Sequence, residues 1–67
     1  MENKIAALLH VMELNRELLF AYDNLMAECY REGDVERGDE WLRKGLEVMR
    51  HNDYLDKEID KLRMEYR

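Results

Sequence analysis

The stretch NLMAECYREGDVERGDEWLRKGLEVM, residues 24–49, decides the fold of this 67-residue chain. It contains the only sharp reversal that the sequence offers, Arg31-Glu32-Gly33-Asp34. Gly33 can adopt the left-handed conformation that ends helices, and Asp34 is a good N-cap for the segment that follows. A glycine followed by an aspartate between two periodic segments is a strong signal for one helix to stop and another to begin. We therefore expect two helices joined by a turn at Gly33.

The segment before the turn, residues 2–31, contains neither glycine nor proline. Apolar residues recur along it at alternating spacings of three and four, with Asn15 as the single polar member, which is typical of a helix with one buried stripe. The stripe consists of Ile5, Leu8, Met12, Asn15, Leu19, Tyr22, Met26 and Cys29. The spacing predicts one helix over about residues 2–31.

The segment after the turn predicts a second helix over about residues 34–66. Its outer face carries acidic residues four positions before basic ones, which is the order that stabilises helices. Its expected inward face consists of Val35, Gly38, Leu42, Gly45, Met49, Asn52, Ile59 and Tyr66. Residues 51–53, His-Asn-Asp, are poor helix formers and good caps, so a kink or a break there is left open.

Folding the second helix back about Gly33 brings together positions whose numbers sum to about 67. The rule pairs Cys29 with Gly38, Tyr22 with Gly45, Asn15 with Asn52, and Leu8 with Ile59. Glycine costs about 1 kcal/mol inside a helix relative to alanine, so Gly38 and Gly45 are expected to admit a tyrosine ring and to bring the helices close. A buried asparagine pair is expected to set the register, and partner binding by Asn15 and Asn52 is the less favoured alternative. The predicted fold class is an all-α antiparallel hairpin.

A second apolar stripe remains beside the first on each helix. Two adjacent stripes indicate that each helix contacts two neighbours, of which one lies within the hairpin and the other belongs to another chain. Trp41 is the residue type that anchors interfaces, and we place it on this second stripe, outside the hairpin seam, with an ordinary place in the hairpin core as the less favoured alternative. The expected partner interface consists of Val11, Leu18, Leu25, Trp41, Val48, Leu55 and Leu62.

The length of the chain also favours association. Residues 1–67 make one domain at most, and a single cysteine rules out an internal disulfide. Ordering such a chain costs on the order of 100 kcal/mol and needs roughly 4000 Å² of apolar burial, which a lone hairpin does not reach. We expect the hairpin to complete a four-helix bundle with a partner chain, with a homodimer favoured and a target protein as the other candidate.

Composition narrows the classes of partner and the compartment. Sixteen acidic and eleven basic residues give a net charge of -5, which makes nucleic acid an unfavourable partner. The opening residues do not read as a signal peptide, and no apolar run approaches the ~20 residues needed to span a bilayer. A single free thiol favours a reducing, cytoplasmic setting.

The central stretch resembles a tetratricopeptide repeat, whose two helices follow W-x2-L-G-x2-Y, then a small residue, an aromatic and another small residue. The matching positions are Tyr22 and Leu25 in the first helix, Gly33-Asp34 at the turn, and Gly38, Leu42 and Gly45 in the second. Met26 stands where the repeat has a small glycine, Cys29 at its tyrosine and Arg50 at its proline. The resemblance covers about 30 residues and implies helix-hairpin packing and protein recognition. It implies no peptide-binding groove, which takes at least three repeats.

Signatures of chemistry are missing from the sequence. There is no glycine-rich phosphate loop, CxxC pair or HExxH motif, so we predict no catalytic, cofactor-binding or metal-binding residues and no enzyme. His10 with Glu13, and Glu47 with His51, have helical spacing for metal ligands, but the additional glutamates of a di-metal bundle are lacking. Cys29 lies on an apolar stripe and is interpreted as a small core residue.

The favoured function is therefore a small, acidic, non-enzymatic interaction protein that acts as an adaptor, chaperone-like protein or regulator. The alternative is a regulator connected with nucleic acid. In that case the chain either binds RNA through Arg43, Arg50 and Lys57, which share a seven-residue spacing, or blocks a DNA-binding protein by acidic mimicry.

Overall fold

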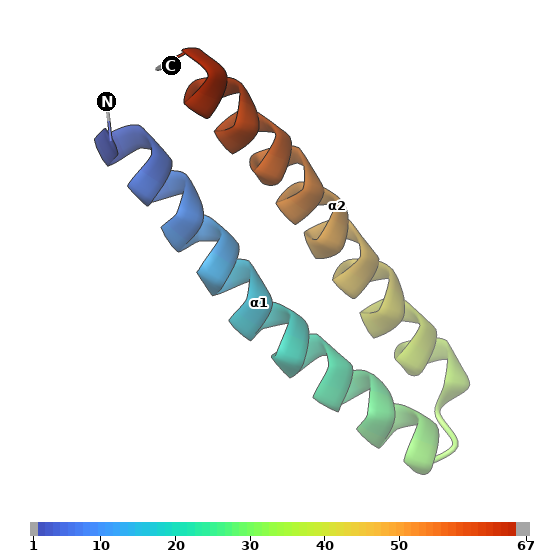
Figure 1. Cartoon of the computed structure of the whole chain (residues 1–67). Helices are drawn as coiled ribbons and strands as arrows, with labels where there is room; N and C mark the ends of the chain where they lie inside the picture. The colour runs from blue at the N-terminus through green and yellow to red at the C-terminus, as the bar shows by residue number, and fades with distance from the viewer. Residues whose placement is uncertain (1, 66–67) are drawn as a thin grey trace.

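The computed structural model describes residues 2–65, with side chains from residue 3 onward. It consists of α1, Glu2–Arg31, and α2, Val35–Glu65, which lie side by side in opposite directions (Figure 1). The first turn of α1 and the last turn of α2 lie at the same end, and the hairpin measures 52 × 14 × 10 Å. The predicted all-α antiparallel hairpin is confirmed. The expected inward position of Tyr66 lies outside the described residues.

The reversal is built from backbone hydrogen bonds around Gly33. The Asp34 amide donates to the Cys29 carbonyl at 2.8 Å, and the Gly33 amide donates to the Tyr30 carbonyl at 3.1 Å. This is the Schellman arrangement, which requires a left-handed residue, and Gly33 supplies it with a φ of 81°. The Asp34 carboxylate then accepts a hydrogen bond from the Arg37 amide at 3.2 Å and caps α2.

The second helix continues without a break through residues 51–53. The side chain of Asn52 is engaged across the seam: it accepts a hydrogen bond from Asn15 Nδ2 at 2.7 Å and donates one to the Met12 carbonyl at 3.4 Å. Because this amide is occupied by the other helix, it does not compete with the backbone of its own helix. The predicted pairing of Asn15 with Asn52 is confirmed, and the kink is not formed.

The buried core lies in the C-terminal part of α2. Among the described side chains, Leu55, Ile59 and Leu62 are buried, and Ile59 is only 2% exposed. The expected placement of Leu55 and Leu62 outside the seam is corrected, because one hairpin already buries both. Trp41 is also in the seam, where it stacks on Tyr22 with ring centroids 5.5 Å apart.

The correction has a simple cause in the spacing of α2. Positions 41, 48, 55 and 62 alternate at spacings of three and four with positions 38, 45, 52 and 59, so both sets face the same neighbouring helix. The remaining residues of the expected inward face, Val35, Leu42 and Met49, are displaced outward and are exposed. The helix is therefore rotated about its axis relative to the prediction.

The two seam glycines have neighbours other than those expected. A Cβ at Gly38 would overlap the ring of Tyr30, and a Cβ at Gly45 would lie 3.8 Å from Leu19 Cδ2. At Gly38 the neighbour is the ring of Tyr30 in place of the predicted Cys29. At Gly45 the neighbour is Leu19, while the Tyr22 ring meets Trp41 instead.

Candidate functional site

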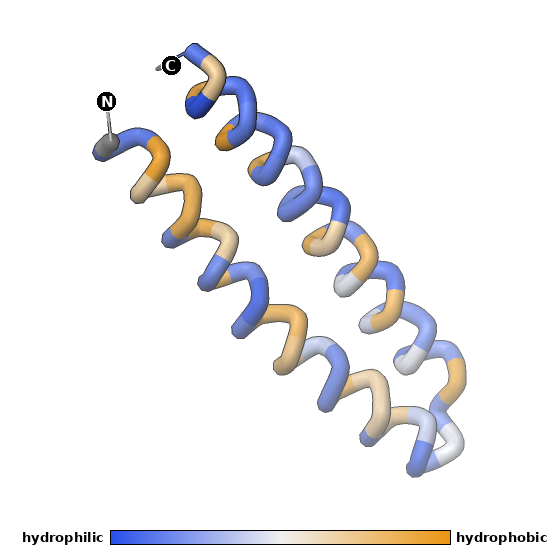
Figure 2. Tube along the Cα trace, in the orientation of Figure 1, coloured by the Kyte–Doolittle hydropathy of each residue, from blue (hydrophilic) through white to orange (hydrophobic). Residues whose placement is uncertain are grey.

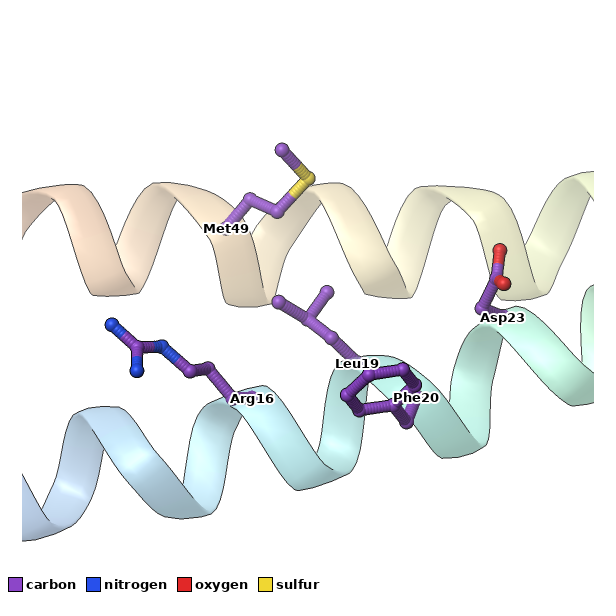
Figure 3. Close-up of a pocket in the computed structure, with 5 residues that line it drawn as sticks. All are labelled: Arg16, Leu19, Phe20, Asp23 and Met49. Atoms are coloured by element: carbon purple, nitrogen blue, oxygen red, sulfur yellow. The ribbon is translucent and has the colours of Figure 1, made fainter.

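One side of the hairpin carries an apolar surface to which both helices contribute. An open hollow on this side is lined by Arg16, Leu19, Phe20, Asp23 and Met49 (Figure 3). Figure 3 shows Leu19 directed toward α2, with Arg16 and Asp23 to either side on α1 and Met49 on the facing helix. The hollow therefore establishes which stripe of α2 lies on the same side as Phe20.

That stripe of α2 extends from Met49 back to the turn. Leu46, Leu42 and Val35 precede Met49 by three, seven and fourteen residues, the spacings that keep side chains on one side of a helix. All are exposed, and Phe20 on α1 is 74% exposed. We call this surface the Met49 face; its apolar residues are Phe20, Val35, Leu42, Leu46 and Met49.

The Met49 face changes character beyond Met49, toward the open end of the hairpin. Asp53, Asp56 and Asp60 follow Met49 by four, seven and eleven residues and continue the same stripe. In Figure 2, hydrophilic positions dominate the C-terminal half of α2. On α2 the apolar part of the face therefore lies next to the turn and is followed by an acidic stretch, beyond which the exposed Met64 continues the stripe. On α1 the exposed Leu9 lies toward the open end and shares a hollow with Arg16.

The opposite side of the hairpin is apolar on α1 alone. Leu14, Leu18 and Leu25 are exposed there, and Val11 beside them is half-buried. On α2 this side carries charged or ionisable residues at seven-residue spacing. They are Arg37, Lys44, His51 and Glu58. The predicted interface residues Val11, Leu18 and Leu25 thus lie on a different surface from the Met49 face.

The predicted interface residues of α2 line the seam. Leu55 and Leu62 are buried in the hairpin, while Trp41 and Val48 are half-buried. The structure therefore does not unite them with Leu18 and Leu25 on one free surface. Leu46 and Phe20 were not predicted as site residues, although the spacing of Leu46 from Leu42 and Met49 was a usable signal for the Met49 face.

The turn-proximal end holds a polar contact between the helices. The Tyr30 hydroxyl donates to Asp39 Oδ1 at 2.5 Å. This hydrogen bond to the carboxylate, with burial as a smaller cause, raises the pKa of Tyr30 above its ordinary value of 10.0. The same ring fills the space left by Gly38, so a single tyrosine both packs and hydrogen-bonds at this end.

The charged surface shows little organisation. The ion pairs within residues 3–65 join neighbours three positions apart on exposed sites, as Arg31 does with Glu28, and such pairs contribute little to stability. Arg43 shares one surface hollow with Glu36, Asp39 and Glu40. The basic residue that starts the Arg43, Arg50 and Lys57 series is thus surrounded by carboxylates, which weakens an attraction for phosphates.

The described chain offers few groups for chemistry. Cys29 is a free, half-buried thiol on α1. Over residues 2–65, three or more potential metal ligands never gather in one place, and neither helix combines the length and apolarity of a membrane span. Asn15 and Asn52, which we call the asparagine layer, form the main polar cluster among the described residues of the seam. Asn15 Nδ2 also lies 3.0 Å from His51 Nδ1.

Comparison of this chain with known proteins identified no relative. No family model, curated protein or solved structure matches the chain.

Proposed function

We propose that the protein is a small, non-enzymatic interaction module that works by completing a helical bundle with another protein chain. The partner is a second copy or a target protein that the chain serves as an adaptor, chaperone-like protein or regulator. The tetratricopeptide-like hairpin of the central stretch is in keeping with protein recognition as the activity.

One observation carries this proposal: the hairpin leaves most of its apolar side chains uncovered. Only Leu55, Ile59 and Leu62 are buried among the described side chains, whereas large apolar residues such as Phe20 and Met49 are exposed. Contiguous apolar surface of this kind marks an interaction site in soluble proteins. A chain of 67 residues also needs a partner, a metal or disulfides to gain sufficient stability.

The experiment is native mass spectrometry of the full chain, expressed alone and in its source extract, combined with helical circular dichroism over a range of concentrations. We expect a complex of defined stoichiometry, and a thermal midpoint that rises with concentration if the partner is a second copy. A hetero-complex instead predicts poor folding alone and a stable complex with one other chain. A compact monomer whose stability is independent of concentration, and which binds nothing, would contradict the proposal.

A further inference from the structure

We infer that the Met49 face is covered by a second copy of this chain, related to the first by a two-fold axis parallel to the helices. Both turns then lie at the same end of the bundle, and α1 of each copy packs against α2 of the other. This inference rests on the proposed function, because it names the partner and the orientation for that same association.

The exposed area of the single chain matches what one such interface removes. A compact protein of 8.2 kDa exposes about 4500 Å². This chain exposes 5525 Å², which leaves a surplus of roughly 1000 Å². Stable interfaces of standard size bury about 800 Å² on each partner. One contact with a chain of the same size is therefore sufficient to bring the surface to that of a compact protein.

The distribution of apolar residues selects the orientation. Within the hairpin, Asn15 meets Asn52 and Tyr22 meets Trp41, so Phe20 is level with about residues 43–47 of α2, next to Leu46. With the turns at the same end, Phe20 of one copy meets Leu46 of the other, and the apolar stretches of the two α2 helices lie at the same level. With the turns at opposite ends, the apolar half of α2 instead meets the acidic half of the partner's α2. Carboxylates would then be desolvated against leucines, which is costly.

Charge complementarity favours a second copy over an unrelated partner. Arg16 lies on the Met49 face at the level of residue 51, within one turn of Asp53. In the same-end dimer, Arg16 of each copy approaches Asp53 of the other, so one chain supplies both members of two symmetric pairs. Asp23 lines the same hollow as Arg16, and no basic residue of α2 lies at its level on this face.

The first test compares matched substitutions on the two sides of the hairpin. Leu46 on the Met49 face is 42% exposed and Leu18 on the other side is 40% exposed, so Leu46→Glu and Leu18→Glu change equally exposed helical leucines. Leu46→Glu should raise the dimer dissociation constant on the order of 100-fold, because two leucines leave the interface. Leu18→Glu should change it by less than about threefold. Sedimentation equilibrium measures both, and helical circular dichroism at high concentration verifies folding.

A charge exchange provides a second test of the dimer interface, one that does not depend on apolar burial. Arg16→Glu and Asp53→Arg should each weaken the dimer about three- to tenfold at low salt, because each places like charges together across the interface. The double variant Arg16→Glu with Asp53→Arg should restore the dissociation constant. Equal weakening that adds in the double variant would overturn the assigned contact.

The orientation is tested by distance measurement between the turns. Glu32→Cys in a Cys29→Ser background places one nitroxide label at the turn of each copy. Electron–electron double resonance measures the distance between the two labels. The same-end dimer predicts a distance far below the 52 Å length of the hairpin, whereas opposite-end packing predicts a distance near that length. A distance near the full length would overturn the orientation.

The outcomes separate this inference from the function on which it rests. A dimer that Leu18→Glu dissociates and Leu46→Glu leaves intact overturns the Met49 face and leaves the interaction module standing. A chain that forms a complex only with a different protein overturns the second copy and supports the hetero-complex. A monomer that binds nothing overturns both.

Discussion

The two halves of the hairpin differ in how much of their apolar surface the single chain buries. Toward the helix ends, the seam positions of α2 are Leu55, Ile59 and Leu62, and all are buried. Toward the turn, the seam of α2 contains Gly38, where the Tyr30 ring occupies the space of a Cβ, and Gly45, where a Cβ would make an ordinary contact with Leu19. Glycine offers no side chain to pack, so α2 fills the seam of that half with Trp41 and Val48, which are only half-buried. One half makes its own core, and the other leaves large apolar residues such as Leu42 and Leu46 exposed.

The asparagine layer marks the border between the halves. Asn15 and Asn52 are hydrogen-bonded at 2.7 Å midway along the hairpin, with buried aliphatic residues on one side and glycines with aromatic rings on the other. A polar pair in an apolar seam fixes the register at a cost in stability. Substitutions in the open half, at this border and at the turn end should therefore differ in size and sign.

The largest effect is expected from removing the core of the open half. Ile59→Ala should lower the free energy of unfolding by about 3 kcal/mol, because Ile59 is 2% exposed and its loss leaves a cavity. Met64→Ala, in the same half but exposed, should change it by less than about 0.5 kcal/mol. Urea unfolding followed by helical circular dichroism at one protein concentration measures both. Equal losses would show that this half holds no core.

Making the asparagine layer apolar should change the free energy of unfolding in the opposite direction. Replacing both Asn15 and Asn52 by leucine should raise the free energy of unfolding by about 1 to 2 kcal/mol, because an apolar layer replaces polar groups that are costly to desolvate. The single substitution Asn52→Ala should lower it, because it leaves Asn15 without its 2.7 Å partner. Thermal unfolding of the three variants is the measurement. A double variant that is less stable than the parent would mean that the asparagines stabilise the seam outright.

The glycines of the turn half form a matched pair with opposite expected signs. Gly45→Ala should stabilise the hairpin by about 0.5 to 1 kcal/mol, because its Cβ would make an ordinary contact with Leu19 at 3.8 Å and alanine favours the helix. Gly38→Ala should destabilise it by about 1 kcal/mol, because the displaced Tyr30 ring costs more than the helix gains. Denaturant midpoints compare the two variants. Stabilisation by both would show that the Tyr30 ring moves aside without cost.

The smallest effect concerns pH at the turn end. The pKa of Tyr30 is raised above 10.0, chiefly by its hydrogen bond to Asp39, so the folded state favours the neutral phenol. This stabilising contribution is fully present below the pKa of the unfolded chain and is lost as the pH rises through the folded value. The stability difference between the parent and Tyr30→Phe should therefore shrink at strongly alkaline pH. Unfolding free energies measured from neutral to alkaline pH provide the check, and a difference that grows would contradict the assignment.

Much of the fold follows from local residues. Gly33 and Asp34 signal the reversal because one tolerates a positive φ and the other caps a helix, and both do so in the structure. The alternating spacing of α1 predicts its seam, which includes Asn15, and the sum rule pairs Asn15 with Asn52. These features depend on short-range preferences and on one polar pair that has to be satisfied.

The candidate site was less accessible to sequence reasoning. On α2 the seven-residue spacing predicts separate stripes through Trp41 and through Gly38, and it assigns the stripe through Trp41 to a partner chain. In the structure the two series form one seam, as the burial of Leu55 and the stacking of Trp41 on Tyr22 show. The exposed stripe is the one through Leu42 and Met49 instead. The seven-residue spacing alone does not distinguish the series that interleaves with the seam from one that flanks it.

The sequence by itself determined that this chain is a hairpin of two long helices with more apolar surface than it can bury. Helix propensity, capping and the turn residues act over a few positions, so their effects can be predicted from the sequence alone. Only the tertiary structure decided which stripe of α2 faces α1, because that choice depends on the rotation of one helix against the other. Packing decides the rotation: Leu55, Ile59 and Leu62 fill the seam at one end, and Tyr30 occupies the space of Gly38 at the other.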